Sequence, residues 1–212
     1  PAIVWFRTDL RLGDNCALLA AAGKPVICLY ILEEGGGRRT HGAAQLWWLH
    51  HSLSRLAASL ASIGGALGLR RGDAAAVIDK IIGESGADAV FWNRRYDPQG
   101  IAIDTTVKAG LKARGVLAAS FDGQLLHEPM QVRTGAGNPF KVYTPFWRAI
   151  SALPSPRAPY KAPDKILGFQ GALVSDALED WALLPKNPDW SKGFDADWSP
   201  GEEGAREKLR LF

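Results

Sequence analysis

The chain has 212 residues, of which 47% are hydrophobic and 22% are charged, and its formal net charge is +3. This is the composition of an ordinary globular protein with enough apolar residues to build its own core. Cys16 and Cys28 are the only cysteines, which excludes a disulfide scaffold. The sequence contains neither an apolar run of about 18 residues nor a signal-peptide pattern, so we expect no membrane contact and a cytoplasmic location.

Five short apolar runs, rich in β-branched and aromatic residues, predict the strands of a sheet. They are residues 2–6, 26–31, 66–70, 89–92 and 116–121. Continuous rather than alternating hydrophobicity is typical of parallel strands that are buried on both faces.

Helical patterns separate these runs. The predicted helices cover residues 16–22, 41–63, 73–82 and the residues from 97 onward. Their predicted N-caps include Asp14 or Asn15 for the first, Asp73 for the third and Asp97, followed by Pro98, for the fourth. The alternation of strand and helix predicts an α/β fold, a doubly wound five-stranded parallel sheet flanked by helices and Rossmann-like in architecture.

Residues 151–212 differ in composition from residues 1–150. The first 150 residues hold 17 Lys and Arg against 12 Asp and Glu, whereas the remaining 62 hold 8 against 10. Four prolines in residues 154–163 exclude a regular helix or a central strand, so we interpret this stretch as a linker. Residues 200–212 predict a helix whose apolar end lacks a surface to pack on, which indicates a chain cut shortly after it enters a second domain.

Polar loops follow two of the predicted strands, at the edge where doubly wound sheets bind ligands. The residues concerned are Arg7, Asp9 and Arg11 after the first strand, and Asn93, Arg94, Tyr96 and Asp97 after the fourth. Guanidinium groups and an aromatic ring at one edge could hold a planar polar ligand. Each loop taken singly is also typical of an exposed basic loop.

The motifs of several other site classes are absent. The loop after the first strand is not GxGxxG, and the sequence has no P-loop and no GxSxG elbow. His50 and His51 are adjacent and diverge on a helix, so we expect no metal site there. The run of three glycines and two arginines at residues 35–39 suits phosphate in composition but is more typical of an exposed loop.

An aromatic cluster lies in residues 140–148, FKVYTPFWR. Its apolar area exceeds what a surface loop normally exposes. Core packing beneath the sheet and contact with another domain both explain it, and the sequence leaves the two open.

Five segments in chain order carry a family resemblance. They are residues 4–15 (VWFRTDLRLGDN), 46–53 (LWWLHHSL), 92–98 (WNRRYDP), 143–148 (YTPFWR) and 198–202 (WSPGE). Together they resemble the opening motif, the first long helix, two later signatures and the start of the flavin domain of the DNA photolyase and cryptochrome family.

The resemblance implies a domain organisation. Residues 1–150 would be an α/β antenna-chromophore domain, residues 151–199 an interdomain linker, and residues 200–212 the truncated start of a helical FAD-binding domain. Photolyases of this family repair UV-induced pyrimidine dimers in DNA by light-driven electron transfer from FAD, so the parent protein would be a DNA photolyase, a carbon-carbon lyase. The residues that bind FAD and DNA would lie beyond Phe212, and we expect the chain alone not to repair DNA.

The partners that the resemblance implies are UV-damaged DNA, for the parent protein, and the chain's own C-terminal FAD domain. The contact with that domain would involve Tyr143, Phe146, Trp147 and Arg148. We expect a monomer.

The resemblance also implies an antenna pigment, either a deazaflavin or methenyltetrahydrofolate. The implied pigment-binding residues are Arg7, Asp9, Arg11, Cys28, Asn93, Arg94, Tyr96 and Asp97. Some folate-binding members carry Asn-Glu where this chain has Gln99-Gly100, so the motif resembles the deazaflavin type more closely.

Two alternatives remain at this point. A cryptochrome photoreceptor shares the domain but signals instead of repairing DNA, and nothing in residues 1–212 separates the two. A nucleotide-binding module of similar fold would require a glycine-rich phosphate loop, which the sequence lacks.

Overall fold

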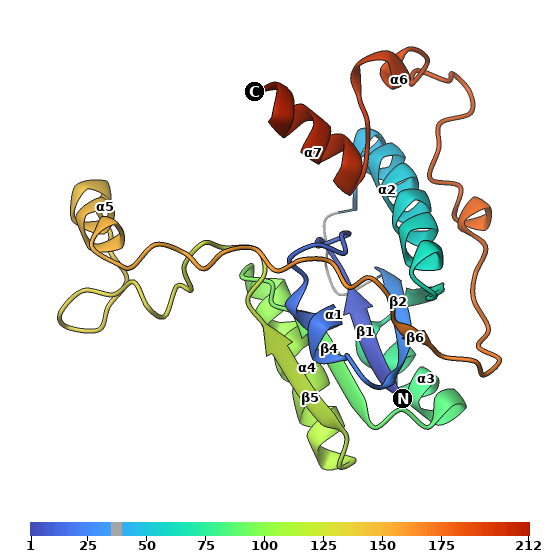
Figure 1. Ribbon diagram of the computed structural model, residues 1–212, viewed down its shortest axis with the longest axis horizontal. Helices are drawn as coiled ribbons and strands as arrows, with labels where there is room; N and C mark the ends of the chain where they lie inside the picture. The colour runs from blue at the N-terminus through green and yellow to red at the C-terminus, as the bar shows by residue number, and fades with distance from the viewer. Residues whose placement is uncertain (35–39) are drawn as a thin grey trace.

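Five parallel strands form the sheet at the centre of the fold, in the order β3-β2-β1-β4-β5 (Figure 1). They are β1 (Ala2–Phe6), β2 (Pro25–Glu33), β3 (Leu67–Gly72), β4 (Ala89–Asn93) and β5 (Leu117–Phe121). The computed structural model describes residues 1–34 and 40–212, so the predicted loop at residues 35–39 lies outside the described residues. The predicted α/β fold class and its parallel sheet are confirmed.

The four crossover helices are α1 (Cys16–Ala20), α2 (Ala43–Ser62), α3 (Ala74–Ser85) and α4 (Pro98–Ala113). Asn15 caps α1 by accepting a hydrogen bond from the Leu18 amide at 3.1 Å. Asp73 and Asp97 cap α3 and α4 in the same way. The predicted caps are confirmed, and Asn15 rather than Asp14 is the cap of α1.

β1 lies in the middle of the sheet and is buried on both faces. Its five side chains are 0% exposed. Val4 and Phe6 pack on the face covered by α1 and α2, whereas Ile3 and Trp5 pack on the face covered by α3 and α4. Helices on both faces explain why this strand is apolar throughout.

Part of the predicted linker packs on the sheet. β6 (Leu167–Gly168) pairs in parallel with the start of β2, and η1 (Leu178–Trp181) brings Trp181 into a buried cluster with Tyr30 and Leu53. Trp181 is 5% exposed. The chain therefore returns to the α/β domain by residue 160, where the Tyr160 carbonyl accepts a hydrogen bond from the Asp14 amide, while the predicted domain boundaries stay a prediction.

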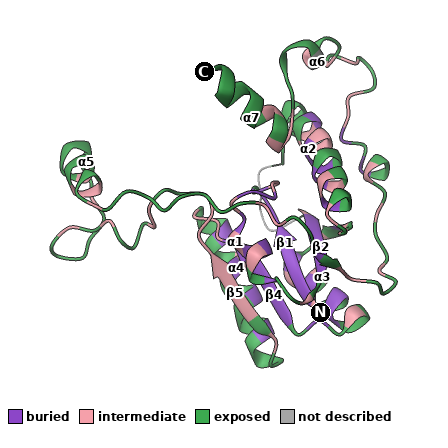
Figure 2. Cartoon of the chain, in the orientation of Figure 1, coloured by how far each residue is buried: buried purple, intermediate pink, exposed green. Residues whose placement is uncertain are grey.

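The aromatic cluster of residues 140–148 lies away from the sheet. Figure 1 shows α5 (Tyr143–Ser151) at the end of an arm that extends from the body of the fold. None of its residues is buried, and Figure 2 shows the helix largely exposed. The interpretation of this cluster as core packing is wrong, because no element of the sheet reaches it.

Two helices follow the packed segment, α6 (Phe194–Asp197) and α7 (Glu202–Leu211). The ring of Trp198, between them, lies 5.9 Å from that of Trp48 on α2. The helix predicted in residues 200–212 is confirmed as α7. Within residues 1–34 and 40–212, no helix has both the length and the hydrophobicity needed to cross a bilayer.

We predict that Trp181→Ala destabilises the α/β domain by about 3–5 kcal/mol, because it empties a buried site beside Tyr30. Urea unfolding followed by circular dichroism measures the change. Trp147→Ala on the exposed α5 is the matched control and should change the free energy of unfolding by less than about 0.5 kcal/mol. Equal effects of the two substitutions would show that residues 164–183 do not belong to the cooperative unit.

Candidate functional site

The strand order reverses at β1, which has β2 on one side and β4 on the other. In doubly wound sheets such a reversal opens a crevice at the carboxyl ends of the strands, where ligands bind. The predicted site residues of the loops after β1 and β4 lie at this point. The contacts of these side chains show whether they are available to a ligand.

The Arg7 side chain binds other groups of the protein. Its guanidinium forms an ion pair with Asp104 of α4 at 2.7 Å, donates to the Asn93 carbonyl and lies 4.5 Å from the centre of the Trp5 ring. Burial lowers the pKa of Arg7, and the Asp104 carboxylate partly offsets this by stabilising the charged form. A buried charge must be paired in this way, so Arg7 fixes α4 against the ends of β1 and β4.

Asp9, Asn15 and Asn93 form a buried hydrogen-bond network beside this ion pair. The Asp9 carboxylate accepts from the Arg7 amide at 2.9 Å and from Asn93 Nδ2 at 2.6 Å. Asn93 Nδ2 also donates to Asn15 Oδ1 at 3.0 Å, and Asn93 Oδ1 accepts from the Ala17 amide. The three side chains are at most 2% exposed. The structure thus brings Asp9 and Asn93 together, and with Asn15 they bind one another at the ends of β1 and β4.

Arg94 and Tyr96 anchor the arm that carries α5. Arg94 Nη1 donates to the Ser120 carbonyl at 2.6 Å, and its Nη2 lies 3.3 Å from Glu128 Oε1. The Tyr96 hydroxyl also donates to Glu128. Burial, together with this hydrogen bond, raises the pKa of Tyr96 to about 12, so the phenol remains a donor at neutral pH.

The other three predicted residues lie in different surroundings. Asp97 caps α4 and pairs with Arg95 at 2.9 Å. Cys28 is fully buried in the core beneath α1 and α2, where burial raises the pKa of its thiol to about 12. Arg11 binds three backbone carbonyls, including that of Gly123 at 2.6 Å, and reaches the cavity described next.

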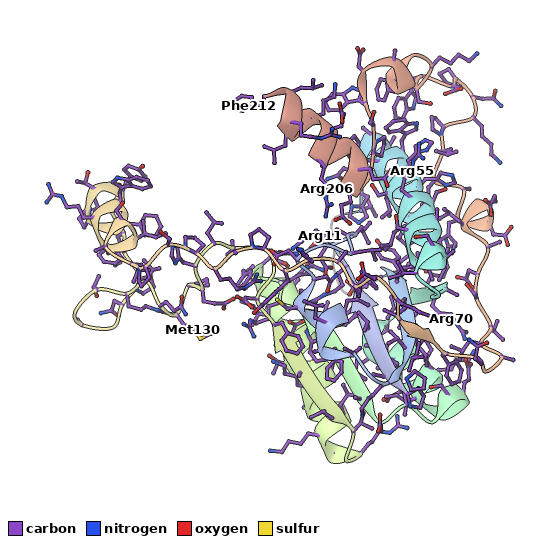
Figure 3. The ribbon with its side chains drawn as sticks, in the orientation of Figure 1. Arg11, Arg55, Arg70, Met130, Arg206 and Phe212 are labelled. Carbon is purple, nitrogen blue, oxygen red and sulfur yellow. The ribbon has the colours of Figure 1, made fainter. Side chains whose placement is uncertain are left out.

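A cavity of about 1260 Å³ opens next to the Arg7 ion pair, and Arg7 is part of its lining. It lies among the ends of β1 and β2, helices α2 and α7, and the chain that leads from β4 into α4. Its wall includes Arg7, Thr8, Leu10, Arg11, Gly13, Tyr30, Glu33, Gln45, Trp48, Leu49, Arg95, Gln99, Tyr160, Trp181, Glu202, Arg206 and Leu209. Figure 3 shows Arg11 and Arg206 near one another, at the end of α7 that faces the sheet.

The lining combines aromatic and aliphatic surface with a few guanidinium, carboxylate and amide groups. Such a wall suits an organic ring system with polar edges. Among the residues that the structure describes, no group of three or more His, Cys, Asp or Glu side chains could hold a metal ion. Of the eight predicted site residues, Arg7 and Arg11 line the cavity, and pigment contact by all eight stays a prediction.

Most residues of the cavity wall could not be found from the sequence. Trp48 and Leu49 lie on α2, Trp181 on η1 and Arg206 on α7, so the wall combines residues more than 150 positions apart. No local motif joins these positions. The one signal was Trp48, a large aromatic residue of α2 that is 41% exposed and does not belong to the buried face of the helix.

Comparison with known proteins identifies the relatives of this chain. The sequence profile of the DNA photolyase family matches residues 2–164. A deoxyribodipyrimidine photo-lyase of Agrobacterium fabrum is 51% identical over the whole chain, which covers 44% of that relative. Cryptochrome-1 of Arabidopsis thaliana is 36% identical over 95% of the chain and is covered over 31% of its length.

The fold agrees with this relationship. The crystal structure of a bacterial class III photolyase from Agrobacterium tumefaciens superposes with a TM-score of 0.93 at 50% identity, over 99% of this chain and 44% of that one. The chain therefore spans less than half the length of these relatives.

We predict that Asp9→Ala costs about 2 kcal/mol or more of folding free energy, because the buried Arg7 amide loses its side-chain acceptor and the buried Asn93 Nδ2 loses one of its two acceptors. Urea unfolding measures the loss. Asp79→Ala, which removes one side of the exposed pair with Arg114, should cost less than about 1 kcal/mol. A stable Asp9→Ala protein would contradict a structural role for the network.

Proposed function

Because the chain belongs to the DNA photolyase family, we propose that it is the light-harvesting α/β part of a deoxyribodipyrimidine photolyase. The intact protein would repair UV-induced pyrimidine dimers in DNA, and residues 200–212 would begin the helical part that binds FAD. We propose a monomer in the cytoplasm. The chain alone would hold a pigment and would not repair DNA.

The observation that carries this proposal is the cavity of about 1260 Å³. Its volume and its mixed aromatic and polar wall suit a planar pigment such as a deazaflavin or methenyltetrahydrofolate. When bound, the pigment supplies absorption of light, and FAD in the helical part supplies the electron for dimer cleavage.

The residues of this chain would bind and orient the pigment. Trp48 and Tyr30 offer aromatic surface, and Arg11 offers a guanidinium at the polar edge of the cavity. Gln99 also lines the cavity, and it is followed by Gly100, where some folate-binding members of the family carry a glutamate. This difference favours a deazaflavin over a folate.

The exposed helix α5 supports a contact with the FAD-binding part. Tyr143 is 70% exposed and Trp147 is 55% exposed. Their rings are stacked, with 6.2 Å between the ring centres. Two large rings on a helix without buried residues form an apolar surface that a partner would cover. We propose that Tyr143, Phe146, Trp147 and Arg148 pack on the helical FAD-binding part of the same protein.

We predict that the purified chain binds one of the two pigments and that Trp48→Ala weakens this binding about tenfold or more, because an aromatic wall is lost. Titration followed by pigment absorbance and fluorescence measures the affinity. Trp147→Ala removes an equally large exposed ring outside the cavity and should leave the affinity unchanged. If the unmodified chain binds neither pigment, the light-harvesting role is refuted.

Repair is tested on the full-length protein that contains residues 1–212. We expect loss of pyrimidine dimers from UV-irradiated DNA in blue light and none in the dark. A pigmented protein that leaves the dimers intact in light would instead favour a photoreceptor, the function suggested by the similarity to Cryptochrome-1.

A further inference from the structure

Helix α7 is attached to the loop after β1 through one carboxylate. Glu202, in the first turn of α7, accepts hydrogen bonds from the Leu12 amide at 2.7 Å and from the Gly13 amide at 3.1 Å. Arg206, one turn later, donates to the same carboxylate at 2.5 Å. Two consecutive amides and a guanidinium therefore bind a single side chain from a segment about 190 positions away.

Gly13 makes this approach possible. A Cβ atom at position 13 would lie 2.6 Å from Glu202 Oε1 and would also clash with Arg206 Nη2. A side chain at this position would therefore require the ends of both side chains to move. The loop thus combines two amide donors with a glycine that leaves room for the carboxylate.

Within residues 1–34 and 40–212, no other hydrogen bond joins α7 to the α/β domain. The helix has no buried residue, and Leu209 and Leu211 are 74% and 75% exposed. Hydrogen bonds to a carboxylate are roughly twice as strong as neutral ones, so the Glu202 contact is the main directional contact that we find for this helix.

α7 also forms one wall of the large cavity. Glu202, Ala205, Arg206 and Leu209 line it. A second cavity of about 530 Å³ lies on another side of α7, and Glu202 and Arg206 border both cavities. The position of α7 therefore sets the shape of the larger cavity, and the Glu202 contact sets the position of α7.

We propose that Glu202 is a positioning residue that holds α7 as a wall of the cavity and thereby sets the affinity for the ligand bound there. The identity of the ligand rests on the proposed function, whereas the attachment of α7 does not. The sequence marked Glu202 only as an acidic residue near a helix N-terminus, and its partners, Leu12 and Gly13, lie in a different domain of the predicted organisation.

The test compares Glu202→Gln with Glu203→Gln in the 212-residue chain. Both substitutions remove one negative charge from the first turn of α7, but Glu203 is exposed and faces neither Leu12 nor Gly13 in any hydrogen bond of the described residues. Gly13→Ala disturbs the same contact from the opposite side. Circular dichroism checks that each variant is folded.

Amide hydrogen exchange is the first measurement. We expect exchange at Leu12, Gly13 and the amides of α7 to be about tenfold faster or more in Glu202→Gln and in Gly13→Ala, and unchanged in Glu203→Gln. Unchanged exchange in Glu202→Gln would overturn the proposal.

Pigment affinity is the second measurement. We expect the dissociation constant to rise several-fold in Glu202→Gln and to stay unchanged in Glu203→Gln. Faster exchange with an unchanged dissociation constant would overturn the positioning role. If the unmodified chain binds no pigment, the proposed function fails, and the exchange result alone decides whether Glu202 holds α7.

Discussion

The polar network between the ends of β1 and β4 is the constraint on which the remainder of the site depends. Asp9, Asn93 and Asn15 bind one another and nearby backbone amides, and the Arg7 ion pair lies beside them. A fully satisfied buried network admits few alternative arrangements. It fixes the loop after β1, and this loop supplies Arg11 to the cavity and the two amides that bind α7. The cavity opens beside this network and is lined by residues that follow β1, β2 and β4.

The strands and most helix ends could be predicted from the sequence because their causes are local. Continuous apolar runs specify strands that are buried on both faces, and an Asp or Asn at the right distance specifies a cap. The roles of the polar residues after the strands could not be predicted in this way. The sequence shows that Arg7 is a guanidinium at a strand end, but nothing identifies Asp104, in the middle of a predicted helix, as its partner.

The cavity wall could not be predicted from the sequence either. Its wall comes from segments whose proximity depends on how α2, η1 and α7 pack, and β6 is only two residues long. A pairing this short leaves no periodic pattern. The aromatic cluster around α5 was visible as excess apolar surface, but composition does not say whether such a surface faces a core or a partner. The arm that carries this cluster can be recognised only from the contacts of Arg94 and Tyr96 with Glu128 at its base.

The return of the chain through β6 makes the α/β domain discontinuous in sequence. Residues 1–121 build the main sheet, the next forty or so residues leave it, and Trp181 closes the cluster over Tyr30. Hydrogen bonds hold both ends of the segment that leaves the sheet. Near its start the Tyr96 hydroxyl donates to Glu128, and near its end the Asp14 amide donates to the Tyr160 carbonyl. During synthesis, therefore, the sheet can form while α5 is already outside the ribosome, but the cluster around Trp181 closes only after residue 181 has emerged. The exposed aromatic helix is thus displayed before the domain from which it projects is complete.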